Sequence, residues 1–342
     1  MTNLYTADLH LTSNPRDGYR WRVFPWLSKV VRKHHVDSLY ILGDLTEAKD
    51  RHAATLVNRL VFELRKLSKL VPVTVLQGNH DYIDDEQPFF GFLGKLGARV
   101  RYVSKPTYAN GKVWLPSTRS EEPLAETIRG LLAGAGVGHE DVTHVYFHHP
   151  LAGARLASGT SYDKGYTLPT EDHWVAVGGD IHVPQKLGGN VWYTGSPHPV
   201  DFGDDYVPRV LLERDGKITS LRRTNAPQKL ILTAEGEVPD VSEVAKGAQV
   251  CVRITLQPND LHRWAELKRE TVAVCKGAGL DLLRLELLGA KTTLPDEEAS
   301  SGPGNASNDP LQVLNRFADK LGADESTLAY GRALLEGAQD VT

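Results

Sequence analysis

The sequence predicts an α/β fold, and three observations lead to that prediction. In the first half of the chain, short apolar runs alternate with segments in which apolar residues recur every three to four positions. Polar and charged residues directly follow several of the apolar runs, and a second strand–helix–strand pattern occupies residues 249–288. Strand, helix and strand in this order are typical of sheets covered by helices.

The first half supplies most of the predicted elements. Residues 4–7, 38–42 and 71–77 are short apolar or β-branched runs, so we expect strands there. Residues 21–35 and 53–70 have the spacing of amphipathic helices. Further strands are expected at 144–147, 174–177, 191–193, 207–212 and 218–222.

The composition changes after about residue 224. Residues 249–256, 258–276 and 280–288 predict a compact strand, helix and strand, and 294–310 is rich in Pro, Gly, Ser, Asn and acidic residues, as linkers are. Helical stretches are expected at 310–321 and 325–338. We therefore expect four parts: an α/β domain (1–224), a smaller α/β domain (225–293), a linker (294–309) and a C-terminal helical segment (310–342).

Length, charge and cysteine content narrow the function classes. The 342 residues suggest about two domains, and 41% hydrophobic with 24% charged residues is ordinary for a soluble globular protein. The net charge of −4 argues against a protein that coats DNA by charge alone, although a nuclease needs only a local basic patch. Cys251 and Cys275 form no disulfide framework, which favours a reducing compartment. With no apparent signal peptide or membrane-length apolar run, we expect a cytoplasmic protein with no membrane partner.

Residue types that bind metals gather where the predicted strands end. In open α/β sheets, sites form at the carboxyl ends of the strands, so side chains far apart in sequence converge there. Carboxylate, imidazole and amide ligands without thiolates suit Mn, Fe or Zn ions. Three aspartates cannot share a dry pocket unless cations neutralise them. The candidate ligands are Asp8, His10, Asp44, Asn79, His148, Asp180 and His182.

This set of ligands predicts two-metal phosphoesterase chemistry. Asp44 can bridge two ions about 3.5–4 Å apart, and such a pair binds phosphate oxygens and activates a water for in-line attack. His80 follows the Asn79 ligand, and we expect it to donate a hydrogen bond to the phosphate or a proton to the leaving oxygen. Asp81 is expected to orient His80. His80 and Asp81 are therefore the predicted catalytic residues.

The strand-end residues form five motifs: Asp8-Leu9-His10, Gly43-Asp44, Gly78-Asn79-His80-Asp81, His148 and Gly179-Asp180-Ile181-His182. Together they resemble the five motifs of calcineurin-like metallophosphoesterases. Within that superfamily the chain is most similar to the SbcD branch, the nuclease subunits of recombination and double-strand-break repair complexes, including phage versions. The likeness to this branch lies in Gly179–Gly203. The resemblance covers roughly residues 1–225, and the C-terminal third is less similar to the capping domain and tail of that family.

The resemblance implies a fold, a pair of metals and partners. The implied fold is a β-sandwich flanked by helices, with a smaller α/β capping domain and C-terminal helices. Two divalent ions are implied, with Mn²⁺ expected and Zn²⁺, Fe²⁺ or Mg²⁺ as alternatives. The implied partners are DNA and an SbcC-type coiled-coil ATPase that binds residues 310–338, and a homodimer is an alternative assembly. By resemblance, Asp8, His10, Asp44 and His182 hold one metal, and Asp44, Asn79, His148 and Asp180 hold the other.

Two positions depart from the superfamily pattern. Asp180 stands where the superfamily usually has histidine, and an aspartate ligand favours a harder ion such as Mn²⁺. Thr46 and Glu47 stand where many relatives have a histidine that helps to position the phosphate. His52 lies on the same segment and is an alternative for that role.

Alternatives stay open for several other side chains. The superfamily pattern favours His148 over its neighbour His149 as the ligand. His198, in Gly-Ser-Pro-His-Pro, is expected either to bind the DNA substrate or to stand in a rigid turn bounded by prolines. The six tryptophans are interpreted as core residues rather than as stacking platforms for bases.

Three functions are compatible with the sequence. We expect a two-metal-dependent DNA exonuclease/endonuclease that hydrolyses phosphodiester bonds as the nuclease subunit of an SbcCD-like complex. The alternative is a small-substrate metallophosphoesterase, such as a cyclic-nucleotide phosphodiesterase or a phosphatase. The third is a non-catalytic scaffold for an ATPase partner, and the complete ligand set argues against it.

Overall fold

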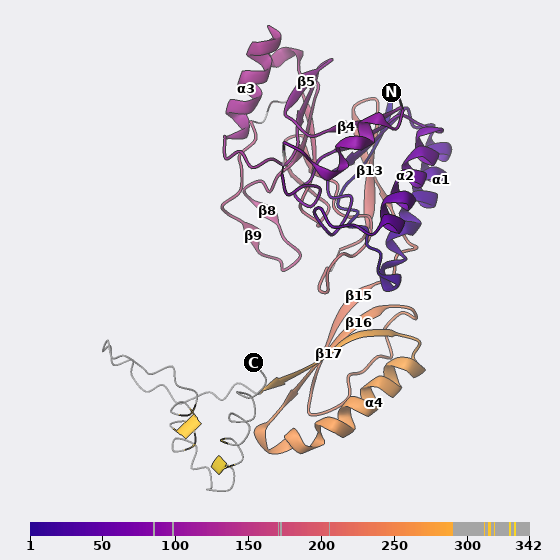
Figure 1. The fold of residues 1–342 in the computed structure, drawn as a ribbon, viewed down its shortest axis with the longest axis vertical. Helices are drawn as coiled ribbons and strands as arrows, with labels where there is room; N and C mark the ends of the chain where they lie inside the picture. Colours follow the sequence, from indigo (N-terminus) through magenta and orange to yellow (C-terminus); the bar gives the residue numbers. More distant parts are fainter. Residues whose placement is uncertain are drawn as a thin grey trace, which may run out of the picture. The chain divides into compact units, whose positions relative to one another are not determined.

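The computed structural model describes residues 1–84, 86–97, 99–169, 171, 173–204 and 206–289, with seven residues of the C-terminal segment (Figure 1). The chain forms two compact units, Met1–Ala290 and Lys291–Thr342. Every predicted metal ligand lies in the first unit.

The first sheet has six strands in the order β14-β13-β1-β2-β3-β4. β1 to β4 run parallel, while β13 and β14 extend the sheet as antiparallel strands. β1, β2 and β3 are almost entirely buried, as expected for parallel strands covered on both faces. The strands are β1 (Thr2–Thr6), β2 (Ser38–Leu42), β3 (Val73–Leu76), β4 (Val100–Val103), β13 (Arg209–Arg214) and β14 (Lys217–Arg222).

The second sheet also has six strands, in the order β11-β12-β10-β7-β6-β5. β6, β7, β10 and β12 run parallel, and β5 and β11 are antiparallel edge strands. The strands are β5 (Thr107–Ala109), β6 (Lys112–Leu115), β7 (His144–His148), β10 (Val175–Gly179), β11 (Gln185–Gly188) and β12 (Val191–Tyr193). A hairpin of β8 (Ala154–Arg155) and β9 (Ser161–Tyr162) follows β7.

Helices cover the outer faces of the two sheets (Figure 1). α1 (Val23–His34) and α2 (Ala54–Ser68) bury their apolar faces on the first sheet, and α3 (Leu124–Ala135) does so on the second. Between the sheets lies an aromatic core that includes Tyr5, Tyr40, Trp114 and Tyr146. The predicted α/β fold, a β-sandwich flanked by helices, is therefore confirmed.

The predicted helix at 21–35 is divided in the structure. It opens as a 3-10 helix at Arg20–Arg22 and continues as α1. Trp21, Trp114 and Trp174 are buried, and Trp26, Trp192 and Trp264 are partly buried, which agrees with core roles. Other short 3-10 helices are Pro15–Asp17, Phe89–Lys95 and His139–Asp141.

A separate three-stranded parallel sheet follows β14. Its order is β15-β16-β17, with α4 crossing between β16 and β17 and burying Leu267 and Cys275 against the sheet. The predicted helix at 258–276 begins as a 3-10 helix, Pro258–Arg263, where Pro258 and Asn259 favour a turn. The elements are β15 (Lys229–Glu235), β16 (Gln249–Leu256), α4 (Trp264–Gly277) and β17 (Asp281–Gly289).

The predicted linker (294–309) and most residues of the predicted C-terminal helices lie outside the described residues. Those described after Gly289 are Leu311, Leu314, Asn315, Ala318, Leu328, Ala329 and Arg332, all in helical conformation. The Arg332 guanidinium donates hydrogen bonds to Asn315 Oδ1, at 2.9 Å from Nη2. The domain boundaries predicted at 224 and 293 stay a prediction. In the part of the chain that the structure describes, no helix is long and apolar enough to span a membrane.

Candidate metal centre

Five strand ends bring the predicted ligands together. β1, β2 and β3 of the first sheet deliver Asp8, His10, Asp44 and Asn79, and β7 and β10 of the second deliver His148, Asp180 and His182. Candidate ligand atoms lie within 4.8 Å of one another in three overlapping groups: Asp8, His10 and His182; His10, Asp44 and His80; and Asp8, Asp44 and His148.

The backbone at these strand ends adopts a conformation that side chains other than glycine rarely take. The φ angles are 54° at Asp8, 41° at His10, 53° at Asp44 and 90° at Asp180. Such positive values cost free energy and persist where the surrounding structure holds them. The Asp8 N–H donates to the Gly43 carbonyl and the His10 N–H to the Asp44 carbonyl, both at 3.0 Å. The first two ligand loops therefore hold each other in place.

Glycines before the ligands allow this close approach. A Cβ on Gly43 would lie 2.0 Å from His148 Nδ1, and the φ of Gly43 is +98°. A Cβ on Gly78 would lie 2.2 Å from Asp44 Oδ1. Gly43-Asp44 and Gly78-Asn79 are therefore steric requirements of the site as well as sequence motifs.

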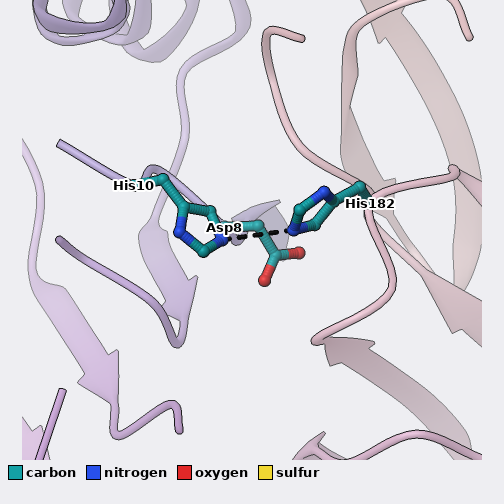
Figure 2. A group of neighbouring side chains, drawn as sticks. All are labelled: Asp8, His10 and His182. Carbon is teal, nitrogen blue, oxygen red and sulfur yellow. Dashed lines mark hydrogen bonds between the residues drawn. The ribbon is translucent and has the colours of Figure 1, made fainter. Parts of the chain in front are cut away.

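The first group consists of Asp8, His10 and His182 (Figure 2). The Nε2 atoms of His10 and His182 lie 3.2 Å apart, and the Asp8 carboxylate lies beside both rings. One Asp8 oxygen accepts the Asp180 N–H at 3.0 Å. The other is buried and has no hydrogen-bond partner in the described part of the chain. This leaves a carboxylate oxygen and two imidazoles around one position.

The second group surrounds His148. Its Nδ1–H donates to the Leu42 carbonyl at 2.7 Å, which leaves the lone pair of the neutral ring on Nε2. That Nε2 lies 3.3 Å from Asp44 Oδ1 and 3.8 Å from Asp180 Oδ1. The Asn79 side-chain oxygen lies 3.0 Å from the same Nε2 and 3.2 Å from both Asp44 oxygens. Asp44 therefore lies against both groups.

These residues fit a pair of divalent cations. The Asn79 oxygen faces only hydrogen-bond acceptors. A cation among those acceptors would stabilise this arrangement. Without a cation, rotating the amide by half a turn would let its NH₂ group donate to them instead. Asp8 and Asp44 are at most 3% exposed, so their charges need neutralising partners. Oxygen and imidazole donors without thiolates match the ligands that Mn, Fe and Zn ions take.

Burial and neighbouring charges act in opposite directions on the acids. Burial raises the pKa of Asp8, and it raises the pKa of Asp180 to about 6. For Asp44, burial also acts upward, but His148 and His10 hold its pKa well below the usual value. Burial opposes the charge on His182, yet Asp204 and Asp8 raise its pKa to about 9. The neighbouring histidines therefore keep the Asp44 carboxylate negative despite its burial.

Asp81 has a different contact from the one predicted. Its fully buried carboxylate accepts the N–H groups of Asp44 at 2.9 Å, Leu45 at 2.8 Å and Gly78 at 2.8 Å. Within the described residues it forms no hydrogen bond with His80, whose Nδ1 contacts the Glu47 carbonyl instead, so the prediction that Asp81 orients His80 is wrong. Burial, and then the charge of Asp44, raises the pKa of Asp81 to about 7. Asp81 instead fixes the backbone that carries Asp44.

His80 lies at the rim of the cluster. Its N–H donates to Asp44 Oδ1 at 2.9 Å, and its ring packs edge-on against His10 with centroids 4.9 Å apart. The Nδ1–H donates to the Glu47 carbonyl at 2.7 Å, so Nε2 carries the lone pair of the neutral ring. A ring held in this way can accept or donate a proton at Nε2.

Glu47 is a site residue whose contacts the sequence did not reveal. Its Oε2 lies 3.4 Å from His10 Nδ1 and 3.0 Å from Arg20 Nη1. The contact with His10, against the effect of burial, lowers the pKa of Glu47 to about 2. The buried Arg20 also donates to the His10 carbonyl. The departure from the family pattern at position 47 drew attention to Glu47, but nothing in the sequence indicated its contact with Arg20.

His52 does not take the place of the family histidine in this structure. Its ring packs against Phe89 and Phe90, with centroids 4.5 and 5.2 Å away, and it belongs to none of the three groups around the centre. His149 is likewise turned away from the cluster. Its Nε2–H donates to the Pro116 carbonyl at 3.1 Å, and burial lowers its pKa to about 4.

The prediction that His198 contacts substrate is wrong. The side chain is 0% exposed, its Nε2–H donates to the Leu9 carbonyl at 2.9 Å, and its Nδ1 accepts from Arg223 at 2.8 Å. Leu9 stands between two predicted ligands, so His198 supports the metal loop from behind. Burial and Arg223 lower the pKa of His198 well below its usual value, which keeps the ring neutral.

Asp204 is a second residue that the sequence did not single out. Its Oδ2 accepts the N–H groups of Val200 at 2.8 Å and Asp201 at 2.9 Å, and lies 3.8 Å from His182 Nδ1. A carboxylate behind a metal-binding histidine orients the ring and makes it a stronger ligand. The only sequence signal was its place just after the stretch that resembles the SbcD branch.

The chain is similar to two known proteins over part of its length. A relative, the UDP-2,3-diacylglucosamine hydrolase of Shewanella pealeana, is 35% identical over 88 residues, which are 25% of this chain and 36% of the relative. The chain thus matches about a third of that relative's length. The solved structure of the nuclease MPE of Pseudomonas putida has 16% identity and a TM-score of 0.29, covering 64% of this chain and 87% of that one. That score is too low to support an argument about function.

The family comparison covers the predicted ligands. Residues 1–184, more than half of the chain, match the calcineurin-like phosphoesterase family. The matched segment begins before Asp8 and ends after His182, and so includes all five strand-end motifs. The chain therefore belongs to the calcineurin-like phosphoesterases, metal-dependent hydrolases of phosphate esters that use a dinuclear metal centre.

Proposed function

We propose that the protein is a nuclease that hydrolyses phosphodiester bonds of DNA at a dinuclear centre. The observation that carries the proposal is the position of Asp44, whose oxygens lie 3.4 Å from His10 Nε2 and 3.3 Å from His148 Nε2. Asp8, His10, Asp44 and His182 would hold one ion, and Asp44, Asn79, His148 and Asp180 the other.

Each side chain of the centre then has a definite role. When bound, the two ions supply Lewis-acid polarisation of the phosphate and an activated water. Asp44 faces both positions, and Asp81 keeps its backbone in place through three N–H groups. His80 has its Nδ1–H held by the Glu47 carbonyl, so it would donate through Nε2 to the phosphate or to the leaving oxygen when the ring is in its imidazolium form.

Two features favour a polymeric substrate over a small one. An open cleft of about 320 Å³ adjoins Glu47 and is lined by residues of the two-sheet sandwich and of the three-stranded sheet, among them Arg16, Lys229 and Arg284. A long anionic strand can use contacts on both parts, whereas a small substrate needs only the centre. The stretch Gly179–Gly203 also resembles the SbcD branch, and on this basis we propose the finer assignment to that branch.

A second candidate is hydrolysis of a small phosphate diester or anhydride. It is favoured by the local 35% identity to a UDP-2,3-diacylglucosamine hydrolase. Since the match covers 25% of this chain, it bears on the shared catalytic motifs more than on substrate choice.

The test sets labelled DNA beside small substrates. Purified protein with Mn²⁺ is incubated with end-labelled single- and double-stranded DNA, with an aryl phosphodiester and with UDP-2,3-diacylglucosamine. We expect DNA cleavage that EDTA stops and that Asp44→Asn abolishes without loss of fold. Turnover of only the small substrates would replace the nuclease by the second candidate, and undiminished cleavage by Asp44→Asn would exclude the two-metal assignment.

We also propose that residues 310–338 bind the coiled-coil of an SbcC-type ATPase. The proposal rests on the resemblance and on the apolar stripe of Leu311 and Leu314 in that segment. Deleting the residues after Asp309 should leave metal binding and basal DNA cleavage unchanged and abolish co-purification with the ATPase. Loss of basal cleavage in a truncated protein would show that these helices belong to the catalytic unit.

A further inference from the structure

A cavity of about 470 Å³ lies away from the metal centre. It is lined on one side by the loop that contains Arg16 and Arg22, and on the other by residues around Lys246 and Gln249 of the three-stranded sheet. The connection from β14 to β15, which includes Asn225, forms part of its wall. None of the predicted metal ligands lines it.

The charges around this cavity favour an anion. Arg16, Arg22 and Lys246 contribute three positive charges, against one negative charge from Asp281. Within the described residues, none of these three cations forms an ion pair; the ion pairs found involve other side chains. Three unpaired cations on one concave surface attract an anion more strongly than a mixed surface does.

A buried cation behind the wall adds to this potential. Arg223 is 2% exposed and donates through Nε to Asn225 Oδ1 at 2.9 Å. Burial, and then the positive charge of Arg22, lowers the pKa of Arg223 to about 10. The guanidinium therefore stays charged at neutral pH, close to Arg22.

Gln249 connects the two sides of the cavity. The side chain is 3% exposed, and its Nε2 donates to the Arg16 carbonyl at 2.9 Å. Its Oε1 has no hydrogen-bond donor in the described part of the chain. The hydrogen bond from Nε2 joins the three-stranded sheet to the segment that carries Arg16 and Arg22.

The other cleft, beside Glu47, differs in its balance of charge. Arg16 lines both, so the two hollows are neighbours. In the cleft beside Glu47, however, Arg20 pairs with Glu47 at 3.0 Å, Arg284 pairs with Glu286 at 3.3 Å, and Lys229 donates to the Val200 carbonyl at 2.7 Å. Cations without protein partners are thus concentrated in the cavity of Arg22 and Lys246.

From these observations we propose that the cavity of Arg22 and Lys246, which none of the predicted metal ligands lines, binds phosphate groups of a nucleotide unit. The cations hold the phosphates, and Gln249 fixes the wall between Arg16 and the three-stranded sheet. The nucleotide unit can belong to a nucleic-acid strand or to a free nucleotide. The strand version rests on the proposed nuclease function, whereas phosphate binding itself does not.

The test measures binding to the full-length protein in EDTA, so that the metal centre does not contribute. Calorimetry measures the affinity for inorganic pyrophosphate and for ADP. Fluorescence anisotropy measures the affinity for a labelled single-stranded oligothymidylate. The variant Arg22→Ala/Lys246→Ala removes two exposed cations, and Arg32→Ala/Lys268→Ala removes the same charge from α1 and α4, outside the cavity. Thermal melting of both variants checks the fold.

We expect the cavity variant to weaken pyrophosphate and ADP binding by about tenfold or more, and the control to change it less than about twofold. If a strand enters the cavity, oligothymidylate binding weakens too, and its salt dependence falls by about 0.7 per lost phosphate contact. Weakened ADP binding with unchanged oligothymidylate binding identifies a free nucleotide as the ligand. No pyrophosphate binding by the wild type, or equal weakening in both variants, overturns the proposal whatever the nuclease assay gives.

Discussion

Several side chains of the centre hold the backbone of the ligands rather than a substrate. The Asp81 carboxylate accepts three N–H groups around Asp44, and His198 donates to the carbonyl of Leu9. Arg20 binds the carbonyl of His10 and the carboxylate of Glu47. The backbone of the loops that carry Asp8, His10 and Asp44 is thus fixed before a metal binds, which favours a site of defined geometry.

The role of His80 gives the first prediction. His80→Ala removes the ring at the rim of the cluster, so kcat should fall by roughly 10²–10⁴, the usual contribution of a general acid or base. Metal content should stay at two ions per chain, because the proposed ligand sets do not include His80. Activity assays paired with elemental analysis check this, with the exposed His262→Ala as the control. A lower metal content would make His80 a ligand.

Glu47 gives the second prediction. Its carboxylate lies 3.4 Å from His10 Nδ1, where it can orient the ring and strengthen it as a ligand. Glu47→Gln should weaken Mn²⁺ binding by about 10–100-fold, the usual effect of removing such a partner. Equilibrium dialysis measures the affinity, and Glu126→Gln on α3 is the control for loss of one acid. Equal affinities in wild type and Glu47→Gln would show that the contact is incidental.

The ligands could be predicted from the sequence, but most of their supports could not. Asp8, Asp44 and Asn79 stand at fixed places after apolar runs, so local pattern is enough to find them. Two of the supporting contacts depend on how distant segments pack: His182 with Asp204, and His198 with Leu9. The two alternatives for His198 stayed open for this reason, since a proline-bounded turn does not tell whether its centre is exposed.

At the scale of the elements, the centre depends on strands that end against each other. β2 and β7 belong to different sheets, yet Gly43 after β2 lies so close to His148 at the end of β7 that only hydrogen fits between them. The sequence predicted both strands and the glycine. It could not predict the pairing of their ends, because strand order and the packing of two sheets are not local properties.

Gly43→Ala tests this packing. The new Cβ would lie 2.0 Å from His148 Nδ1 at a φ of +98°, so we expect a loss of roughly 2–4 kcal/mol in the free energy of unfolding. Mn²⁺ binding should weaken as well, because His148 must move. Urea denaturation measures the first effect and calorimetry the second. Gly94→Ala, where a Cβ meets nothing within 4 Å, should change neither.

At the scale of the whole molecule, the sandwich has a polar network at the end of β1 opposite to the centre. Glu213 is 4% exposed, accepts from Asn3 at 2.8 Å and from the Tyr5 hydroxyl, and lies 3.0 Å from His144 Nε2. The network joins β1, β7 and β13, and hence the two sheets. It therefore couples the stability of the sandwich to pH.

The sign of this coupling follows from Glu213. Burial acts upward, but hydrogen bonds from His144, Tyr5 and Asn3 lower its pKa to about 2, against 4.5 for the ordinary group. The native state therefore gains stability above pH 4.5 and loses it as pH falls from about 4.5 to 2. In Glu213→Gln this loss of stability at acid pH should be absent, and the free energy of unfolding at pH 7 should be lower than in the wild type by up to about 3 kcal/mol. Urea midpoints across that range check it, and parallel curves for both proteins would contradict it.

The positive φ angles at Asp8, His10, Asp44 and Asp180 lower the thermal stability of the metal-free protein and hold the ligands in position for a metal. In metal-free protein, Asp8 brings both an unfavourable backbone and a buried charge. Asn tolerates this backbone better and is neutral. Metal-free Asp8→Asn should therefore melt a few degrees above metal-free wild type, and Mn²⁺ should reverse the order because only the wild type gains from binding it. Differential scanning calorimetry of both proteins with and without Mn²⁺ measures the four melting temperatures.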